Sequence, residues 1–146
     1  YVKNKDDILF QILNMALAQV LETLDEIKVS DICGLEKLKR LMVRYGEMIT
    51  DDFGRCLVLT NQRVLSMDSR KRLREIQQFA DSEVQKIIQE GVVDGSIAPC
   101  DPRVVRFAIF GAFNGLAHWY QPDGNLHINE IAKQYLSIFA NGIKPR

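Results

Sequence analysis

A nearly all-apolar segment close to the C-terminus constrains the fold of this chain more than any other feature. Between Val104 and Tyr120 only Arg106, Asn114 and His118 are clearly polar. The segment is short for a transmembrane helix and Arg106 interrupts it, so it does not predict a membrane span. A helix in water that is apolar on nearly every face must be covered on all sides. We therefore expect one face to pack inside its own domain and another to need a partner; the alternative is a monomer that buries both faces.

Helical periodicity also runs through the rest of the chain. Apolar residues recur three and four positions apart in four further segments, 5–26, 35–49, 73–88 and 128–142. Asp101 can cap the helix of the apolar segment, with Pro102 at its first position, and Gly91 is a natural end for the helix that begins near residue 73. Residues 53–65 carry a weak signal, and a strand there would have no partner strand, so we expect a short helix. The predicted fold class is all-α, with six helices in one domain.

The composition fits a compact domain and excludes several kinds of site. The 146 residues are 47% hydrophobic, which is enough for a core, and 19 basic residues balance 19 acidic ones. A nucleic-acid-binding domain usually has a basic excess, so DNA binding by this segment alone is not expected. Cys33, Cys56 and Cys100 are widely spaced and form no zinc pattern with the two histidines. We therefore expect no metal, no cofactor, no membrane partner and a reducing, cytoplasmic location.

Motifs of enzymatic chemistry are absent from the sequence. His118 and His127 are nine positions apart, which is not the spacing of a metal site or a catalytic dyad. No phosphate-binding loop, nucleophile elbow, zinc-protease motif or dinucleotide-binding motif is present. The chain is therefore predicted not to be an enzyme. Two classes of function remain: a helical domain that senses a small molecule, and a helical protein-interaction module without a small-molecule ligand.

The first residues start a helix and carry a resemblance to a known family. Asn4 can cap this helix, and Asp6 and Asp7 place carboxylates in its first turn. Tyr1 followed by Lys3-Asn4-Lys5-Asp6-Asp7-Ile8-Leu9 resembles the junction of TetR-family bacterial transcriptional regulators, where a helix-turn-helix head ends and the effector domain begins. Val2 stands where the family usually has an aromatic residue. The resemblance implies that residues 1–4 are the remnant of a DNA-binding head absent from this chain, and that residues 5–146 are an effector-binding and dimerisation domain.

The resemblance also implies a homodimer and a route to DNA. In the family the last two helices pair across a two-fold axis as a four-helix bundle, and the head binds operator DNA. Tyr1 and Lys5 match family positions that contact DNA phosphates in the intact protein. Small residues on the apolar helix form a ridge that another helix can approach closely. The residues expected at the dimer interface are Ala108, Ala112, Gly115, Trp119, Ile131, Tyr135 and Ile138.

A second face of the apolar helix predicts a small-molecule pocket. Its aromatic and polar side chains recur about one turn apart, and apolar walls with a few hydrogen-bonding groups are typical of such pockets. Taken singly, each of these residues fits a plain core or the dimer edge as well. The turn Trp119-Tyr120-Gln121-Pro122-Asp123-Gly124 resembles the TetR subgroup that senses acyl-CoA thioesters, which implies an acyl-CoA or another lipophilic effector. The residues expected to bind the effector are Met42, Tyr45, Ile49, Phe79, Glu83, Phe107, Phe110, Asn114 and His118.

A basic run, Arg70-Lys71-Arg72-Leu73-Arg74, stands at the start of a predicted helix. Cations at this end oppose the helix dipole, so the run does not stabilise the helix by that route. Two interpretations are open: a solvated helix face, or an anion-binding patch at the mouth of the pocket that suits phosphates.

Overall fold

The computed structural model describes residues 4–145 as an all-α fold with six α-helices, which confirms the predicted fold class. The elements in chain order are α1 (Lys5–Lys28), α2 (Gly34–Ile49), α3 (Asp52–Leu59), the short 3-10 helix η1 (Gln62–Val64), α4 (Met67–Asp94), α5 (Pro102–Trp119) and α6 (Ile128–Ile143). The weak segment after α2 forms α3 and η1, and no strand occurs within residues 4–145. Asn4 and Asp101 cap α1 and α5 through their side chains, as the sequence predicted.

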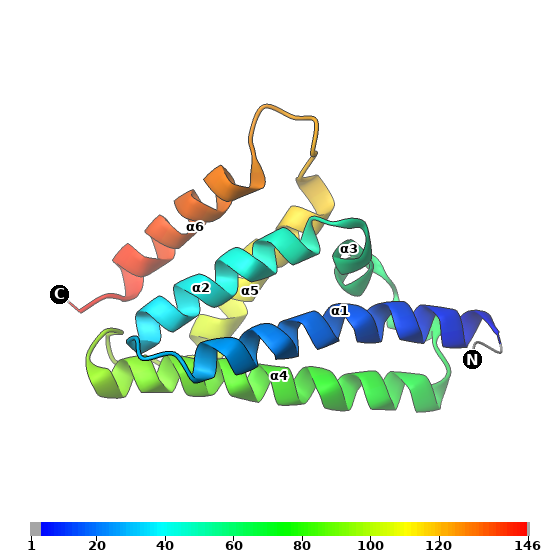
Figure 1. Cartoon of the computed structure of the whole chain (residues 1–146), viewed down its shortest axis with the longest axis horizontal. Coiled ribbons are helices and arrows are strands. Elements are labelled where there is room, and N and C mark those ends of the chain that lie inside the picture. Colours follow the sequence, from blue (N-terminus) through cyan, green and yellow to red (C-terminus); the bar gives the residue numbers. More distant parts are fainter. Residues whose placement is uncertain (1–3, 146) are drawn as a thin grey trace.

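The two longest helices, α1 and α4, form the base of the fold. They lie side by side and run in the same direction, from right to left in Figure 1. The central helix α2 runs the opposite way above them, α5 passes behind α2, and α6 packs on the outer side of α2. The short α3 contacts α1, α2 and α5. As a result, α2 contacts each of the other five α-helices.

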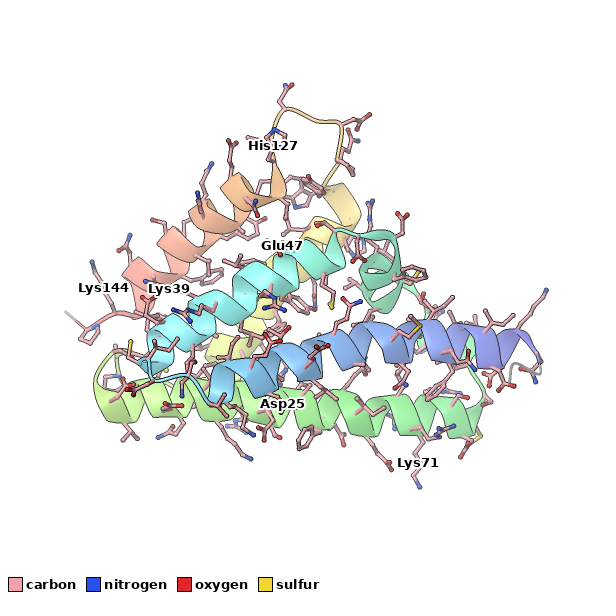
Figure 2. All side chains as sticks on the ribbon, viewed as in Figure 1. Asp25, Lys39, Glu47, Lys71, His127 and Lys144 are labelled. Carbon is pink, nitrogen blue, oxygen red and sulfur yellow. The ribbon has the colours of Figure 1, made fainter. Side chains whose placement is uncertain are left out.

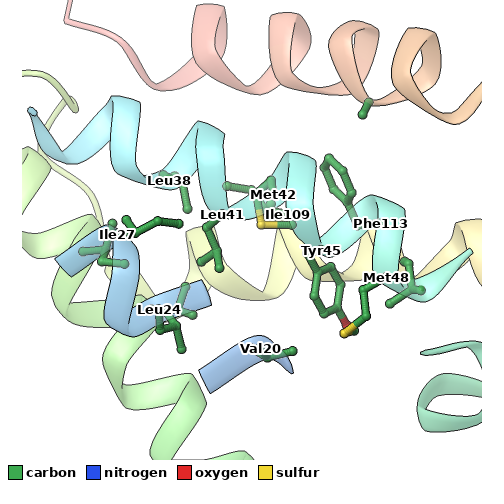
Figure 3. Close-up of a cluster of buried hydrophobic side chains, with 14 of the residues drawn as sticks. Val20, Leu24, Ile27, Leu38, Leu41, Met42, Tyr45, Met48, Ile109 and Phe113 are labelled. Carbon is green, nitrogen blue, oxygen red and sulfur yellow. The ribbon is translucent and has the colours of Figure 1, made fainter. Parts of the chain in front are cut away.

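The main hydrophobic core surrounds α2. Leu41, Met42 and Ile49 are at most 1% exposed, and they pack with Leu24 of α1 and Phe113 of α5 (Figure 3). Burying an aliphatic side chain of this size stabilises a fold by roughly 1.5–3 kcal/mol, so packing of these faces holds the helices together. A second, smaller apolar cluster joins the N-terminal ends of α1 and α4. Its buried members are Phe10, Leu13, Leu17, Leu65 and Leu73.

Two buried charged side chains link α4 to its neighbours. Lys37 of α2 forms an ion pair with Glu90, with 2.7 Å between Nζ and Oε1. Glu83 is 4% exposed and lies between Lys28 of α1, at 2.5 Å, and Lys86, at 2.8 Å. The hydrogen bond from Lys28 is the largest of the effects that lower the pKa of Glu83. A buried charge that lost its partner would be strongly unfavourable, so these pairs fix α1 and α2 against α4.

A close contact between two glycines sets how near α2 comes to α4. A Cβ atom added to Gly34 would lie 2.2 Å from the backbone nitrogen of Gly91, and one added to Gly91 would lie 2.5 Å from Cδ1 of Ile97. The Gly34 N–H also donates to the Asp94 carboxylate at 2.7 Å. The prediction that Gly91 ends the helix is therefore wrong: α4 continues to Asp94 and ends at Gly95, whose φ of +83° suits glycine. Gly91 is glycine because α2 and Ile97 need the space.

One helix among residues 4–145, α1, is long and apolar enough to cross a membrane. The core helix of a soluble protein meets the same criterion. In this fold Leu13 and Leu24 of α1 are at most 1% exposed, and α1 packs against α2, α3 and α4.

We predict that Gly34→Ala will destabilise the protein because the new methyl group meets backbone that side-chain motion cannot move away. The free energy of unfolding, measured by urea denaturation, should fall by at least about 1 kcal/mol, the low end of the cost of overpacking. Gly142→Ala is the matched control, since a Cβ at Gly142 has nothing within 4 Å. The control should keep the wild-type stability or gain up to about 1 kcal/mol from helix propensity. Equal stability of the Gly34 variant and the wild type would contradict the close contact.

Candidate functional site

A cavity of about 450 Å³ lies among the first five α-helices, and we call it the inner cavity. Its size falls within the range of small-molecule sites in proteins. Its apolar lining comes from α1, α3, α4 and α5: Leu17, Val20, Leu57, Val58, Ala80, Val84, Phe107, Phe110 and Gly111. Its polar lining is confined to Tyr45, Gln77, Asp81, Arg106 and Asn114. An apolar enclosure with a few polar groups is the arrangement that binds and orients a lipophilic molecule.

One polar contact in the wall joins α2 to α5. The Tyr45 hydroxyl donates a hydrogen bond to Oδ1 of Asn114, and the Tyr45 ring meets Phe110 edge-on, with 4.8 Å between ring centroids. Burial is the main cause that raises the pKa of Tyr45 well above its ordinary value, so the phenol stays protonated and can donate. In the described part of the chain, the amide nitrogen of Asn114 has no hydrogen-bond acceptor of its own. It can therefore donate to a carbonyl oxygen of a bound molecule.

A cation forms the second polar feature of the cavity. Arg106 of α5 is 12% exposed, pairs with Asp81 of α4 at 3.1 Å, and lies over the Phe107 ring at 4.3 Å. Burial raises the pKa of Asp81, and the nearby Arg106 opposes this rise. The buried Nε of Arg106 has no hydrogen-bond partner among the described residues. An arginine with spare donors beside an apolar cavity suits the carboxylate, thioester or phosphate end of a ligand.

The structure brings four of the nine predicted effector-binding residues to this cavity: Tyr45, Phe107, Phe110 and Asn114. The other five do not line it. Met42 and Ile49 are fully buried in the core, because they lie on the faces of α2 that other helices cover. Glu83 is enclosed by its two lysine partners between α1 and α4. Phe79 and His118 are exposed, since each lies on an outer face of its helix.

The sequence predictions missed the walls that α1 and α3 supply and named the wrong residues of α4. Leu17 and Val20 lie in the predicted helix 5–26, which was given no residue in the pocket, and Leu57 and Val58 belong to the segment with the weak signal. On α4 the sequence did contain a pattern that indicates a cavity wall. Gln77, Asp81 and Val84 recur at helical spacing and place two polar residues beside an apolar stripe.

The predicted dimer residues divide between two faces. Ala108, Trp119 and Ile138 are exposed, with Trp119 at 49% and Ile138 at 68%, and Ala112 and Gly115 are partly exposed. These five lie where a partner helix can reach them. Val104 and Phe107 add exposed apolar surface to the same helix. Neither was in the predicted dimer set, and Phe107 was predicted for the effector site.

Two members of the predicted dimer set face the interior instead. Ile131 is 4% exposed, and Tyr135 packs edge-on against Phe113, with 5.4 Å between ring centroids. The reason is that α6 packs on α2, so this stripe of α6 covers the core of its own chain. Ile131 is thus buried within its own chain and Tyr135 is half-buried there, and their expected place at the dimer interface stays a prediction.

The basic run lies at the start of α4. Lys71 points away from the other helices (Figure 2), and Arg72 lies over the Phe10 ring at 4.5 Å. Arg70 and Arg74 occupy the helical stripe that continues to Gln77 in the cavity wall. At 1.5 Å per residue, Arg74 stands about 4.5 Å along the helix axis from Gln77. Arg74 is thus one turn from the cavity wall, and Arg70 stands about one turn further away along the same stripe.

The start of α1 is fixed to the start of α4 by one carboxylate. Asp6 accepts hydrogen bonds from the Ser66 N–H at 2.7 Å, the Ser66 hydroxyl at 3.1 Å and the Ser69 hydroxyl at 2.8 Å. These bonds, led by the backbone one, lower the pKa of Asp6. Lys5 beside it is exposed, whereas Tyr1, its predicted companion at DNA, lies outside the described residues.

The described residues form an all-helical domain with a ligand-sized cavity, an arrangement typical of domains that bind small molecules. The chain belongs to the TetR family: residues 33–143 match the family described as tetracyclin repressor-like, C-terminal domain. TetR regulators are dimeric, non-enzymatic transcription factors that bind operator DNA and small-molecule effectors. This membership confirms the resemblance drawn from the sequence and the prediction that the chain is not an enzyme.

Individual members of the family are similar to this chain over nearly its whole length. The HTH-type transcriptional repressor KstR2 of Mycolicibacterium smegmatis is 29% identical over 98% of this chain and 71% of its own length. The fatty acid metabolism regulator protein of Bacillus subtilis is 24% identical over 98% of this chain and 75% of its own length. Among solved structures, AibR in complex with isovaleryl coenzyme A and operator DNA matches 94% of this chain and 75% of its own, with a TM-score of 0.82 and 21% identity. This last likeness shows a shared fold.

We predict that Asp6→Asn will remove a pH-dependent part of the stability. Because the folded-state pKa of Asp6 lies below the reference value of 3.8, its contribution is present above that value and is lost as the pH falls through the folded-state pKa. Urea denaturation should show the variant to be less stable than the wild type at neutral pH, with the gap closing in acid. The control Asp31→Asn, in the exposed loop after α1, should show no such gap. A gap that is independent of pH would contradict the assigned role of the Asp6 charge.

Proposed function

We propose that this chain is the effector-binding and dimerisation region, residues 5–146, of a TetR-like transcriptional repressor that works in the cytoplasm. Its effector occupies the inner cavity. The observation that carries this proposal is the cavity itself, which is about 450 Å³, has apolar lining from α1, α3, α4 and α5 and holds polar groups from Tyr45, Arg106 and Asn114. Residues 1–4 then belong to the junction with a DNA-binding head, through which the whole regulator contacts its operator.

The effector is an acyl-CoA or a related lipophilic molecule. The apolar walls suit an acyl chain, and Arg106 and the Asn114 amide suit a thioester or carboxylate group. Arg74 and Arg70, one and two turns along α4 from Gln77 of the cavity wall, suit the phosphates of coenzyme A, which would extend out of the cavity. Two relatives support this ligand class, since one is a fatty acid metabolism regulator and another was solved with isovaleryl coenzyme A.

Occupancy of the cavity can reach the DNA-binding head through α1. Leu17 lines the cavity and also packs in the second apolar cluster, and Leu57 lines the cavity and packs against both clusters. A ligand that fits best when α1 shifts would therefore move the end of α1 that carries Lys5. The recognition helices of such a dimer must stand about 34 Å apart to enter successive major grooves. A preference of the ligand for another spacing would lower DNA affinity through a coupling of roughly 1–3 kcal/mol.

The exposed face of α5 is the centre of the homodimer. Ala108, Gly111 and Gly115 leave space at the helix surface, and a Cβ at Gly111 would meet nothing within 4 Å. Trp119 and Ile138 supply large exposed apolar groups on α5 and α6. Small residues allow the close approach of a second helix, and the large ones supply apolar area to bury.

A helical interaction module without a small-molecule ligand is the second candidate. The exposed apolar groups of α5 and α6 would serve such a module as well as they serve a sensor. A module of this kind has no use for a polar-lined cavity within the domain, so ligand binding separates the two functions.

We predict that an acyl-CoA will stabilise the protein against heat. A ligand at about a hundred times its dissociation constant should add roughly 2.7 kcal/mol, which calorimetry records as a raised melting temperature. Asn114→Leu should reduce this shift, because the ligand carbonyl would lose its donor. The variant also removes the acceptor of the Tyr45 hydroxyl, so each shift is referred to the melting temperature of the same variant without ligand. If acyl-CoAs, fatty acids and aromatic compounds all leave the melting temperature unchanged, the interaction module replaces the sensor.

We further predict that the double variant Arg70→Gln, Arg74→Gln will weaken binding of an acyl-CoA but not of the corresponding free fatty acid. Only the coenzyme carries phosphates for these two cations to contact. Lys133→Gln, at an exposed position of α6, is the control and should change neither affinity. Equal losses for both ligands in a titration calorimeter would show that the cations act on the fold and not on the phosphates.

We predict that the protein is a dimer in solution and that Gly115 lies at its interface. Light scattering coupled to gel filtration should report twice the mass of one chain at micromolar concentration. Gly115→Leu should shift the equilibrium toward monomers, because the larger side chain overpacks the contact between α5 helices. Ala18→Leu, at an exposed position of α1, should leave the dimer intact. A wild-type monomer would rule out the α5 interface, and an unchanged Gly115 variant would move the interface to another face.

A further inference from the structure

A second hollow lies beside the inner cavity, and we call it the outer groove. It has a volume of about 340 Å³ and is lined by residues of α1 and α2 and by Asp51, which caps α3. Val20, Leu41 and Met48 contribute apolar surface to it, and Val20 and Tyr45 line the inner cavity as well. Figure 3 shows Val20 and Met48 close to the Tyr45 ring. The two hollows are therefore separated by the side chains of Val20 and Tyr45.

Tyr45 is the larger part of this partition. It is 8% exposed and packs in the main core, and its directional contacts are a hydrogen bond from its hydroxyl to Asn114 and an edge-on ring contact with Phe110. Both partners belong to α5 and both line the inner cavity. A ligand carbonyl can accept from the amide nitrogen of Asn114, and the ligand can cover Phe110 in place of the Tyr45 ring. If the ring then turns about its side-chain bonds, its hydroxyl leaves Oδ1 of Asn114 and can donate instead to the carboxylates that line the outer groove.

We propose that the inner cavity and the outer groove are two compartments of one effector site, with Tyr45 as the movable wall between them. A short ligand fits in the inner cavity with the wall closed, and a long ligand turns Tyr45 aside and extends its chain between α1 and α2. This inference rests on the proposed function and adds the path of the ligand and the residue that limits its length. It also places a long ligand in direct contact with the helix that leads to the DNA-binding head.

The charges of the groove fix which end of the ligand enters it. Glu22, Glu47 and Asp51 line the groove, and its one lining cation, Arg44, pairs with Glu26 at 3.1 Å. This acidic rim repels a carboxylate or a phosphate. The anionic end of the ligand therefore stays on the side of the inner cavity near Arg106, and the uncharged end of the acyl chain enters the groove.

A length series of straight-chain fatty acids tests the wall in the protein with Tyr45 intact. Gln19 is an exposed residue that lines the groove, so Gln19→Trp fills the groove without disturbing the core. Titration calorimetry should show at least a tenfold loss of affinity for the long acids and unchanged affinity for the short ones. Ala18→Trp, next to it on α1 but not in the lining, should bind every acid as the wild type does.

Tyr45→Leu tests the same wall from the inside. Leucine keeps the site apolar but is shorter, so the longest acid that binds should be longer than in the wild type. In this variant a dicarboxylic acid should bind at least tenfold more weakly than the monocarboxylic acid of equal length, because its second carboxylate meets the acidic rim. A variant that fails to fold leaves the Gln19→Trp comparison as the deciding measurement.

The results test three claims separately: the movable wall, the direction of the ligand and the lipophilic effector. If fatty acids bind but the Gln19 variant loses short and long acids equally, or loses neither, the movable wall is overturned and the inner cavity remains the effector site. If the dicarboxylic acids bind as well as the monocarboxylic ones, the assigned direction of the ligand is overturned. If no acid of any length binds the wild type or the Tyr45 variant, the movable wall falls together with the lipophilic-effector proposal.

Discussion

The contact between Gly34 and Gly91 is the constraint on which the rest of the structure depends. It presses the start of α2 against the backbone of α4, where Lys37 and Glu90 and the bond from Gly34 to Asp94 reinforce it. Because α2 contacts every other α-helix, its position at this joint determines where all of them pack. A larger residue at Gly34 would push α2 outward and enlarge or open the space that now forms the inner cavity, whereas one at Gly91 would displace Ile97.

The inner cavity lies between two fixed ends of α1. At the N-terminal end Asp6 binds the start of α4, and at the C-terminal end Lys28 reaches the buried Glu83. Between these points Leu17 and Val20 form part of the cavity wall. Their side chains are apolar, so they hold α1 by packing and not by ion pairs. A ligand in the cavity can therefore shift the middle of α1, and because Asp6 binds Ser66, the first turn of α1 and the start of α4 would move together. Small changes at a site become larger movements elsewhere when packed elements shift as units.

The sequence predicted the helices well because their signals are local. Caps such as Asn4 and Asp101 and the 3.6-residue period act within one helix, so they can be recognised without knowing the fold. The cavity depends on which faces of different helices meet, and the sequence does not state this. Tyr45 and Asn114 were found because both are polar groups on apolar faces, whereas Met42 and Ile49 were misplaced because an apolar residue looks the same whether it faces a cavity, a core or a partner. Gly91 was misread for a similar reason, since a helix end and a close helix contact both favour glycine.

The central claim is that the inner cavity holds a lipophilic effector, and native mass spectrometry tests it most directly. The protein would be incubated with a mixture of acyl-CoAs and fatty acids, separated from free ligand, and weighed beside an Ala80→Leu variant, whose added side chain occupies part of the cavity. We expect a bound molecule of defined mass on the wild type and its loss from the variant. No bound molecule on the wild type, or the same molecule on both proteins, would contradict it.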